Sequence, residues 1–105
     1  MITYSKIRSL LKKSFPEYKV SVRRVKLSEK LMGDCLLTNG RKKVKEFLIR
    51  INNELDEELA IETLLHEYGH VLAWHAPGDD HGEAWGRAYS KVYRAYLKGY
   101  IESDF

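Results

Sequence analysis

The sequence predicts a single α+β domain over residues 1–105, with an N-terminal helix, a small, mainly antiparallel three-stranded sheet and two C-terminal helices. Three observations predict this class. Apolar residues recur at helical spacing at both ends of the chain, they alternate with polar residues in the middle, and an Asn-Gly pair separates two of the middle segments. A chain of this length buries roughly two-thirds of its unfolded surface, and the sequence contains no repeat or linker that would divide it.

The N-terminal helix is predicted between residues 3 and 14, where three apolar residues recur at helical spacing among basic ones: Ile7, Leu10 and Leu11. Phe15-Pro16 ends this pattern. Residues 18–27 then alternate between apolar and polar side chains, which predicts a strand. Arg23-Arg24 interrupts the alternation, as a β-bulge would.

Two further strands are predicted on either side of Asn39-Gly40. Both residues of this pair accept the positive φ of a type I′ turn, so the pair is a strong hairpin signal. Residues 34–38 form the first of these strands, and residues 41–51 form the second. A hairpin pairs its strands antiparallel, which is why we expect the sheet to be mainly antiparallel.

The second helix is predicted to follow an acidic cluster and to extend to about His75, because acidic side chains suit the positive end of a helix dipole. On a helical wheel, its main apolar stripe consists of Ile61, Leu65, Tyr68 and Leu72. His66 and His70 fall on the opposite side. We therefore expect another part of the chain to cover the histidine side of this helix.

The third helix is predicted to begin near His81, after the breaker segment 76–80. One face of it carries a regular stripe, which is more typical of packing than of a cofactor site: Trp85, Tyr89, Val92, Tyr96 and Tyr100.

The segment His66-Glu67-Tyr68-Gly69-His70 has the His-Glu-x-x-His pattern of zinc hydrolases. Residues four apart lie on one face of a helix, so His66 and His70 can offer two imidazoles to one metal ion. Glu67 then lies beside the metal, where it can act as a base toward water without being a ligand. A pattern of five residues also occurs by chance, so the rest of the sequence has to support it.

A catalytic zinc usually takes three protein ligands and leaves one position to water, so the histidine pair needs one more donor. His81 is the best candidate, because a short turn would bring the start of the next helix back to face the pair. Glu83 is the alternative, and a helix dipole would equally explain an acidic residue there. Asp79 and Asp80 are candidates to orient His81 through its second ring nitrogen, or to cap the helix.

Two other arrangements fit poorly. His75 lies nearer to the apolar stripe than to the histidine face of the second helix. The metzincin pattern requires Gly and His where this chain has Ala73 and Ala76, which excludes that class.

Charge is divided between the two halves of the chain. Residues 1–50 contain 14 Lys or Arg against 4 Asp or Glu, and residues 51–105 contain 4 against 11. A basic half can contact the phosphate backbone of DNA, and a solvated lysine-rich surface would give the same pattern.

The composition excludes several other classes of protein. The single cysteine, Cys35, excludes an intramolecular disulfide framework and a four-cysteine zinc ribbon, and we expect it to be a small buried side chain in a strand. Neither a signal peptide nor a membrane span is expected. We therefore expect a cytoplasmic monomer, or a protein of the host cytoplasm if a phage encodes it, without membrane association.

The motif helix, followed by His81-Gly82-Glu83-Ala84-Trp85, resembles the SprT-like metalloproteases, which include the Spartan proteases. In that family a third histidine lies in a His-Gly-x-x-aromatic segment after the His-Glu-x-x-His helix. The resemblance implies a zincin-like fold, one Zn²⁺ held by His66, His70 and His81, and Glu67 as the catalytic residue. It also implies cleavage of proteins, stimulated by DNA. Many relatives carry a zinc ribbon or DNA-binding region after the protease core, whereas this chain has one cysteine and ends at Phe105, so we expect a minimal core here.

The leading hypothesis is a zinc-dependent endopeptidase that acts on a protein substrate. Tyr89 or Tyr93 is a candidate to assist, and the strand that ends near Ile51 could pair with an extended substrate if it forms the sheet edge beside the cleft. The alternative is a nucleic-acid-binding module with a structural or vestigial zinc site, in which the basic half contacts the backbone. The intact Glu67 and a set of only three good ligands argue against this alternative.

Overall fold

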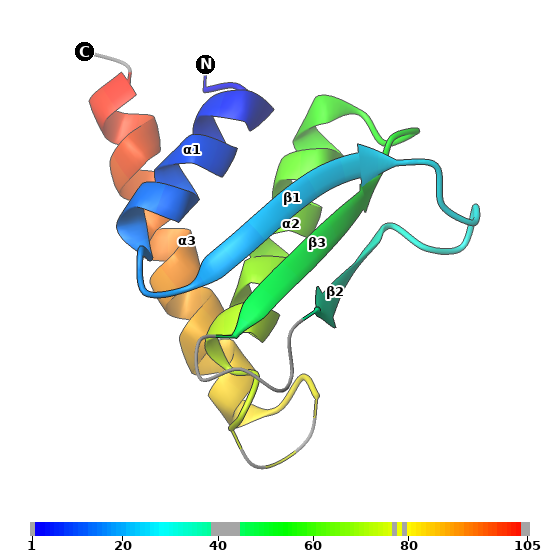
Figure 1. Ribbon diagram of the computed structural model, residues 1–105. Coiled ribbons are helices and arrows are strands. Elements are labelled where there is room, and N and C mark those ends of the chain that lie inside the picture. Colours follow the sequence, from blue (N-terminus) through cyan, green and yellow to red (C-terminus); the bar gives the residue numbers. More distant parts are fainter. Residues whose placement is uncertain (1, 39–44, 77, 79, 104–105) are drawn as a thin grey trace.

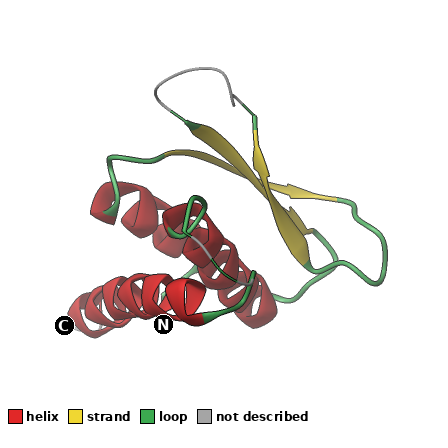
Figure 2. Ribbon diagram, turned by 90° about the horizontal axis from the view of Figure 1, so that it is seen from below, coloured by secondary structure: helices red, strands yellow, loops and turns green. Residues whose placement is uncertain are grey.

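The computed structural model describes residues 2–38, 45–76, 78 and 80–103, and it confirms the α+β class. Its three helices lie on one side of a small sheet (Figure 2). The elements follow the predicted order (Figure 1): α1 (Tyr4–Ser14), β1 (Lys19–Val25), β2 (Gly33–Leu37), β3 (Glu46–Asn52), α2 (Glu57–Leu72) and α3 (Glu83–Ser103). The predicted Asn39-Gly40 turn lies outside the described residues.

The sheet is mixed rather than mainly antiparallel. Its strand order is β1-β3-β2, so the central strand β3 has a different neighbour on each side. β3 pairs parallel with β1 from Lys19↔Glu46 to Val25↔Asn52, and antiparallel with β2. The physical reason lies in β3 itself, whose inward side chains are more deeply buried than those of the other two strands: Phe47, Ile49 and Ile51. The most apolar strand takes the centre. Our expectation that the strand ending near Ile51 could form an edge is therefore wrong, since β3 is paired on both sides and β2 lies at the edge.

β1 pairs with β3 residue for residue, so the bulge predicted at Arg23-Arg24 is absent. Arg24 has the parity of the buried Val20 and Val22, but it lies at the end of the strand. There its guanidinium donates to the carbonyl oxygens of Asn52 and Leu55, and it lies 5.3 Å from the ring centroid of Tyr4. The interruption of the alternation marks the end of the core-facing row and not a change of register.

α2 is the central helix of the fold and packs against α1, α3, β2 and β3. Its side chains are therefore buried on more than the predicted apolar stripe, and buried Leu64 and Val71 extend the core beyond it. The expectation that another part of the chain covers the histidine side is confirmed, because the residues before and within the first turn of α3 lie there. The His-Glu-x-x-His motif therefore lies on the helix that contacts both the other helices and the sheet.

Side chains of the expected kinds cap the first two helices. The Thr3 hydroxyl accepts a hydrogen bond from Lys6 N, and the Asp56 carboxylate accepts one from Leu59 N at 2.8 Å. α3 begins at Glu83, so the third histidine of the motif lies in the turn that precedes the helix. Within the described part of the chain, no helix is both long and apolar enough to cross a membrane.

Candidate metal centre

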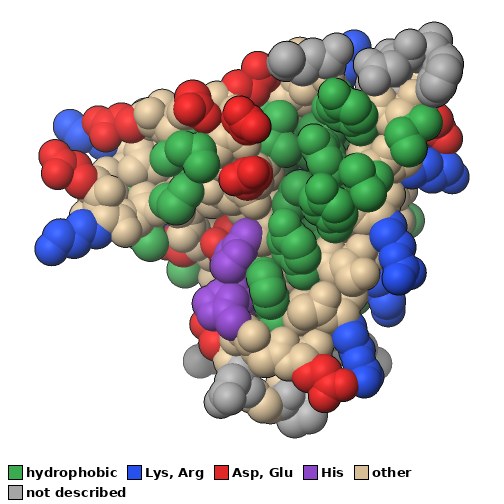
Figure 3. Space-filling model, turned by 180° about the vertical axis from the view of Figure 1, so that it is seen from behind, with side chains coloured by type: hydrophobic (Ala, Val, Ile, Leu, Met, Phe, Trp, Pro, Cys, Tyr) green, Lys and Arg blue, Asp and Glu red, His purple; other side chains and the backbone are tan. Residues whose placement is uncertain are grey.

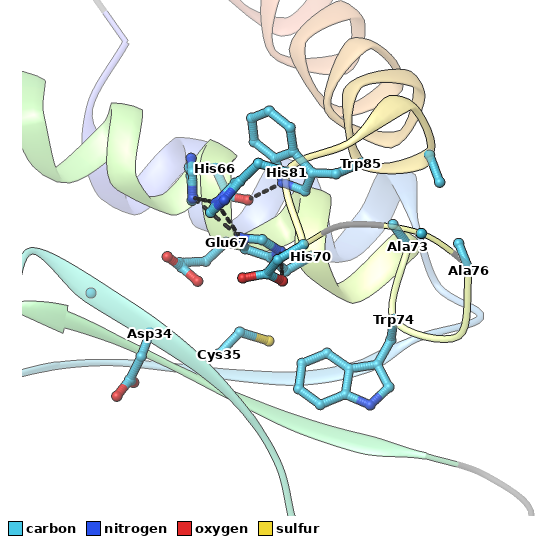
Figure 4. Close-up of a pocket in the computed structure, with 14 residues that line it drawn as sticks. Asp34, Cys35, His66, Glu67, His70, Ala73, Trp74, Ala76, His81 and Trp85 are labelled. Atoms are coloured by element: carbon cyan, nitrogen blue, oxygen red, sulfur yellow. Dashed lines mark hydrogen bonds and ion pairs between the residues drawn. The ribbon is translucent and has the colours of Figure 1, made fainter.

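Three imidazole rings converge at the junction of α2 and the turn before α3 (Figure 4). The Nε2 atoms of His66 and His70 lie 3.2 Å apart, and His81 Nε2 lies 3.1 Å from each of them. Among the described residues, this is the group of histidine, cysteine and acidic side chains that has metal-binding geometry. The structure thus brings together the three predicted ligands.

The donor set fits a metal ion better than it fits hydrogen bonding. A protonated ring nitrogen cannot accept, so three mutually close Nε2 atoms cannot all be satisfied by one another. Four ligands at the usual zinc–nitrogen distance of about 2.0–2.1 Å in a tetrahedron lie about 3.3 Å apart, close to the observed spacing. Imidazole nitrogens also suit zinc better than they suit Mg²⁺ or Ca²⁺.

Burial favours the neutral, ligating form of His66 and His70. It lowers the pKa of both His66 and His70, and the neighbouring histidines lower the pKa of His66 further. For His70, nearby Asp80 acts in the opposite direction. Neutral imidazoles can bind a metal without first losing a proton.

The indole of Trp85 supports all three rings. Its centroid lies 4.9 Å from that of His66, 5.7 Å from that of His70 and 5.2 Å from that of His81. Its Nε1 donates to the backbone oxygen of His66 at 3.3 Å. Sequence reasoning assigned Trp85 to packing in general and missed this role, although its place in the His-Gly-x-x-aromatic segment was a usable signal.

Neither Glu83, the alternative third ligand, nor His75, which fitted poorly, joins the three imidazoles. Glu83 forms an ion pair with Arg87 on the exposed surface of α3, and His75 is exposed beyond the end of α2. Asp80 lies 3.7 Å from Nδ1 of His70, so this carboxylate contacts a ring other than the expected His81. Asp79 lies outside the described residues.

Glu67 is the buried acidic residue of the site, with 7% of its surface exposed. Burial, followed by the carboxylates of Asp34 and Asp80, raises its pKa to about 7. Its carboxylate points into the space between α2 and β2 (Figure 4). A carboxyl group with a pKa near neutrality can both accept and return a proton, as a general base and acid must.

The three histidines and Glu67 line one cavity of about 660 Å³. One wall is the edge strand β2, from which Cys35 points toward the cavity while Asp34 points away (Figure 4). Asp34 accepts two hydrogen bonds from Arg50, its cross-strand partner on β3. Trp74 lines another side of the cavity. Its ring packs edge-to-face on the ring of Phe47, with the two ring centroids 5.4 Å apart.

Two expectations about other side chains can be compared with this cavity. Cys35 is partly buried in a strand as expected, and burial, followed by Glu67 and Asp34, raises its pKa to about 12. Tyr89 and Tyr93 lie along α3 beyond Trp85, and neither lines the cavity. The arrangement therefore gives no role to a tyrosine hydroxyl beside Glu67.

Comparison with known proteins agrees with this geometry. A model of the SprT-like family matches residues 3–103, nearly the whole chain. The chain belongs to the SprT-like family. The search of curated proteins and the search of solved structures each gave no match. Membership of this family fits a role of the metalloprotease type, and the three histidines supply the residues that could bind its metal.

Proposed function

We propose that this SprT-like protein is a zinc-dependent endopeptidase in which His66, His70 and His81 hold the metal and Glu67 is the catalytic residue. The observation that carries the proposal is that the buried carboxyl group of Glu67 opens onto the same cavity as the three converging Nε2 atoms. A structural zinc site normally closes with four protein ligands, whereas three leave one position for water.

When bound, zinc would supply the Lewis acidity that lowers the pKa of water toward about 7 and polarises a carbonyl group. Glu67 takes the proton from the attacking water. It then returns this proton to the amine of the broken peptide bond. The same carboxylate therefore acts first as base and then as acid.

The polypeptide substrate would lie along β2. This strand pairs only with β3 within the described sheet, and Gly33 and Cys35 border the cavity. An extended peptide can add to such an edge through backbone hydrogen bonds. This assignment moves the substrate from β3, where the sequence suggested it, to the strand that forms the edge.

Glu67→Gln tests the proposal directly. The variant should bind zinc as wild type does, and its kcat toward an unfolded protein substrate should fall by at least about 100-fold, because the base is lost while the ligands stay. Glu83→Gln is the matched control, since Glu83 is exposed on α3 away from the cavity. Full proteolysis by zinc-loaded Glu67→Gln would refute the role of Glu67.

We also propose that the basic half of the chain contacts DNA. The supporting observation is a surface hollow that residues of α1, β1 and β3 line, with the basic side chains of Lys12, Lys19 and Arg23 among them. Lys19 is paired with Glu46 of the same hollow, so Lys12 and Arg23 are the basic side chains that would contact phosphate. Phosphate contacts of this kind weaken steeply as salt increases. Arg23→Glu should reduce binding to duplex DNA at low salt, and Lys91→Glu on α3 is the charge-matched control. Equal binding by both variants, or none by wild type, would exclude this use of the hollow.

A further inference from the structure

A second hollow lies between α2 and α3, outside the metal cavity, and has a volume of about 400 Å³. Four residues of α2 and three of α3 line it: Glu58, Ile61, Glu62, Leu65, Tyr89, Tyr93 and Tyr96. Figure 3 shows this face of the molecule, where acidic side chains and a band of apolar and aromatic side chains lie beside the histidines. The Lys and Arg side chains lie toward the edges of the same view.

The acidic side of the hollow continues the row of metal ligands. Glu58, Glu62, His66 and His70 follow one another at intervals of four residues along α2, so they lie on one face. The hollow therefore begins one helical turn from the metal centre. Two like charges at this spacing repel each other, which a bound cation would relieve.

Neither glutamate is neutralised within the described part of the chain. Glu58 and Glu62 are exposed, and no ion pair there involves them. On α3, the basic residue Arg87 pairs with Glu83 and not with either of these glutamates. The hollow thus carries uncompensated negative charge in a protein whose net charge is +3.

The opposite side of the hollow is a ladder of aromatic rings. Tyr89 lies 5.0 Å from Trp85 by ring centroids, Tyr93 lies 6.1 Å from Tyr89, and Tyr96 lies 5.7 Å from Tyr93. Tyr93 is 41% exposed, although tyrosine rings usually gain from burial. Its ring is therefore accessible to a ligand.

The unpaired carboxylates also affect the hydroxyl groups of the neighbouring tyrosines. Burial is the main cause that raises the pKa of Tyr89 and of Tyr96, and the neighbouring tyrosines raise both further. Glu62 also raises the pKa of both hydroxyls, and Glu58 that of Tyr96. These shifts agree with the two unpaired carboxylates of Glu58 and Glu62 at the edge of the hollow.

We propose that this hollow binds a lysine or arginine side chain of a polypeptide. The ammonium or guanidinium would lie between the two carboxylates and the face of a tyrosine ring, which attracts cations. Ile61 and Leu65 would contact the methylene stem, which prefers an apolar wall. A hard metal cation fits less well, because it requires six or more oxygen ligands and this hollow is largely aromatic and aliphatic.

The inference that this basic side chain belongs to a polypeptide rests on the proposed function. An extended chain in the metal cavity can continue past His66 along α2, and its next basic side chain would then reach the hollow. The proposal adds a requirement that the catalytic residues do not impose, namely a basic residue a short distance from the cleaved bond.

Binding in the Glu67→Gln background tests the hollow without turnover. We would measure fluorescence anisotropy with a labelled, flexible peptide that contains lysines, and with the same peptide carrying glutamine in their place. The lysine peptide should bind at least about tenfold more tightly. Glu58→Gln/Glu62→Gln should remove this preference, and Tyr93→Leu, which keeps an apolar side chain but no ring, should weaken binding of the lysine peptide severalfold.

Glu17→Gln/Glu29→Gln is the control, because it changes the net charge equally at exposed positions far from the hollow. It should keep the preference for lysine. The proposal is overturned if the glutamine peptide binds equally well, or if both double variants lose the preference to the same extent. If the hollow selects lysine but zinc-loaded wild type cleaves no peptide, the binding proposal is supported and the proposed peptidase activity is refuted.

Discussion

The indole of Trp85 lies against α2 at the one position of the motif that has no side chain, Gly69. A Cβ on Gly69 would lie 2.9 Å from Trp85 Nε1 and 3.4 Å from Cε2. The glycine therefore lets the indole approach closely enough to donate to His66 and to contact all three imidazole rings. Close approach of a ring, rather than an unusual backbone conformation, explains glycine at this position.

Gly69→Ala should destabilise the protein and weaken metal binding. The added methyl group gains up to about 1 kcal/mol of helix propensity, but displacing a packed indole typically costs about 1–3 kcal/mol. Gly86→Ala is the control, because a Cβ there meets nothing within 4 Å, and it should stabilise α3 by up to about 1 kcal/mol. Urea unfolding of both variants should show opposite signs, and stabilisation by Gly69→Ala would contradict the packing role.

The convergence of the three histidines could be predicted from sequence because their spacing follows local rules. His66 and His70 share a helix face at a fixed spacing, and His81 follows after one short turn, so no knowledge of the sheet was needed. The helices could be predicted for a similar reason, since each has its own apolar period and its own end signals.

The order of the strands could not be predicted, because it depends on contacts between distant residues. Asn39-Gly40 indicated which strands are joined but not that β3 also pairs with β1 through Val20↔Phe47. The same applies to Gly69, whose role depends on a tryptophan sixteen residues away, and to Asp34, whose charge is paired with Arg50 across the sheet. These features arise only when separate segments meet.

Removal of the third histidine should abolish tight zinc binding. Loss of an outer-shell partner costs about 10–100-fold in metal affinity, so His81→Ala, which removes a ligand, should cost at least about 100-fold. His75→Ala is the control, because His75 is exposed and lies outside the ligand group. Zinc content by elemental analysis and the zinc-dependent rise in melting temperature would measure the effect. Unchanged zinc content in His81→Ala would remove His81 from the site.

The contribution of Glu67 to the stability of the metal-free protein should fall as pH rises from about 4.5 to about 7. Folding raises the pKa of Glu67 from 4.5 to about 7, so in this window the folded state keeps a proton that the unfolded state releases. The full effect is up to about 3 kcal/mol above pH 7.

The histidines titrate in the same range with the opposite sign. Folding lowers the pKa of His66 and His70, so their contribution to stability increases with pH. The difference between wild type and Glu67→Gln isolates the glutamate: the metal-free variant should be the more stable protein at pH 8, with the gap closing toward pH 4. Chemical unfolding at several pH values measures this difference, and a gap that does not change with pH would show that the Glu67 pKa is not raised.

Asn52 ties the connection between β1 and β2 to the end of β3, and its removal should loosen the edge strand of the cleft. Its buried side chain donates from Nδ2 to the carbonyl oxygens of Ser28 and Leu31, at 3.2 and 3.0 Å, and its Oδ1 accepts from Glu54 N at 3.1 Å. Loss of these bonds in Asn52→Ala should lower the free energy of unfolding by about 1–3 kcal/mol.

Asn53→Ala is the matched control, because Asn53 is exposed and its side chain forms no hydrogen bond within the described residues; its stability should stay within about 0.5 kcal/mol of wild type. His66, His70 and Glu67 lie on α2 and His81 lies in the turn before α3, so none of them is on the loosened strand. Asn52→Ala should therefore keep zinc affinity and kcat while KM for a polypeptide increases, because β2 begins at Gly33 directly after the tied connection. If substrate binds along β2, loosening this strand must weaken substrate binding more than it slows the chemical step. An unchanged KM in a destabilised Asn52→Ala protein would place the substrate elsewhere.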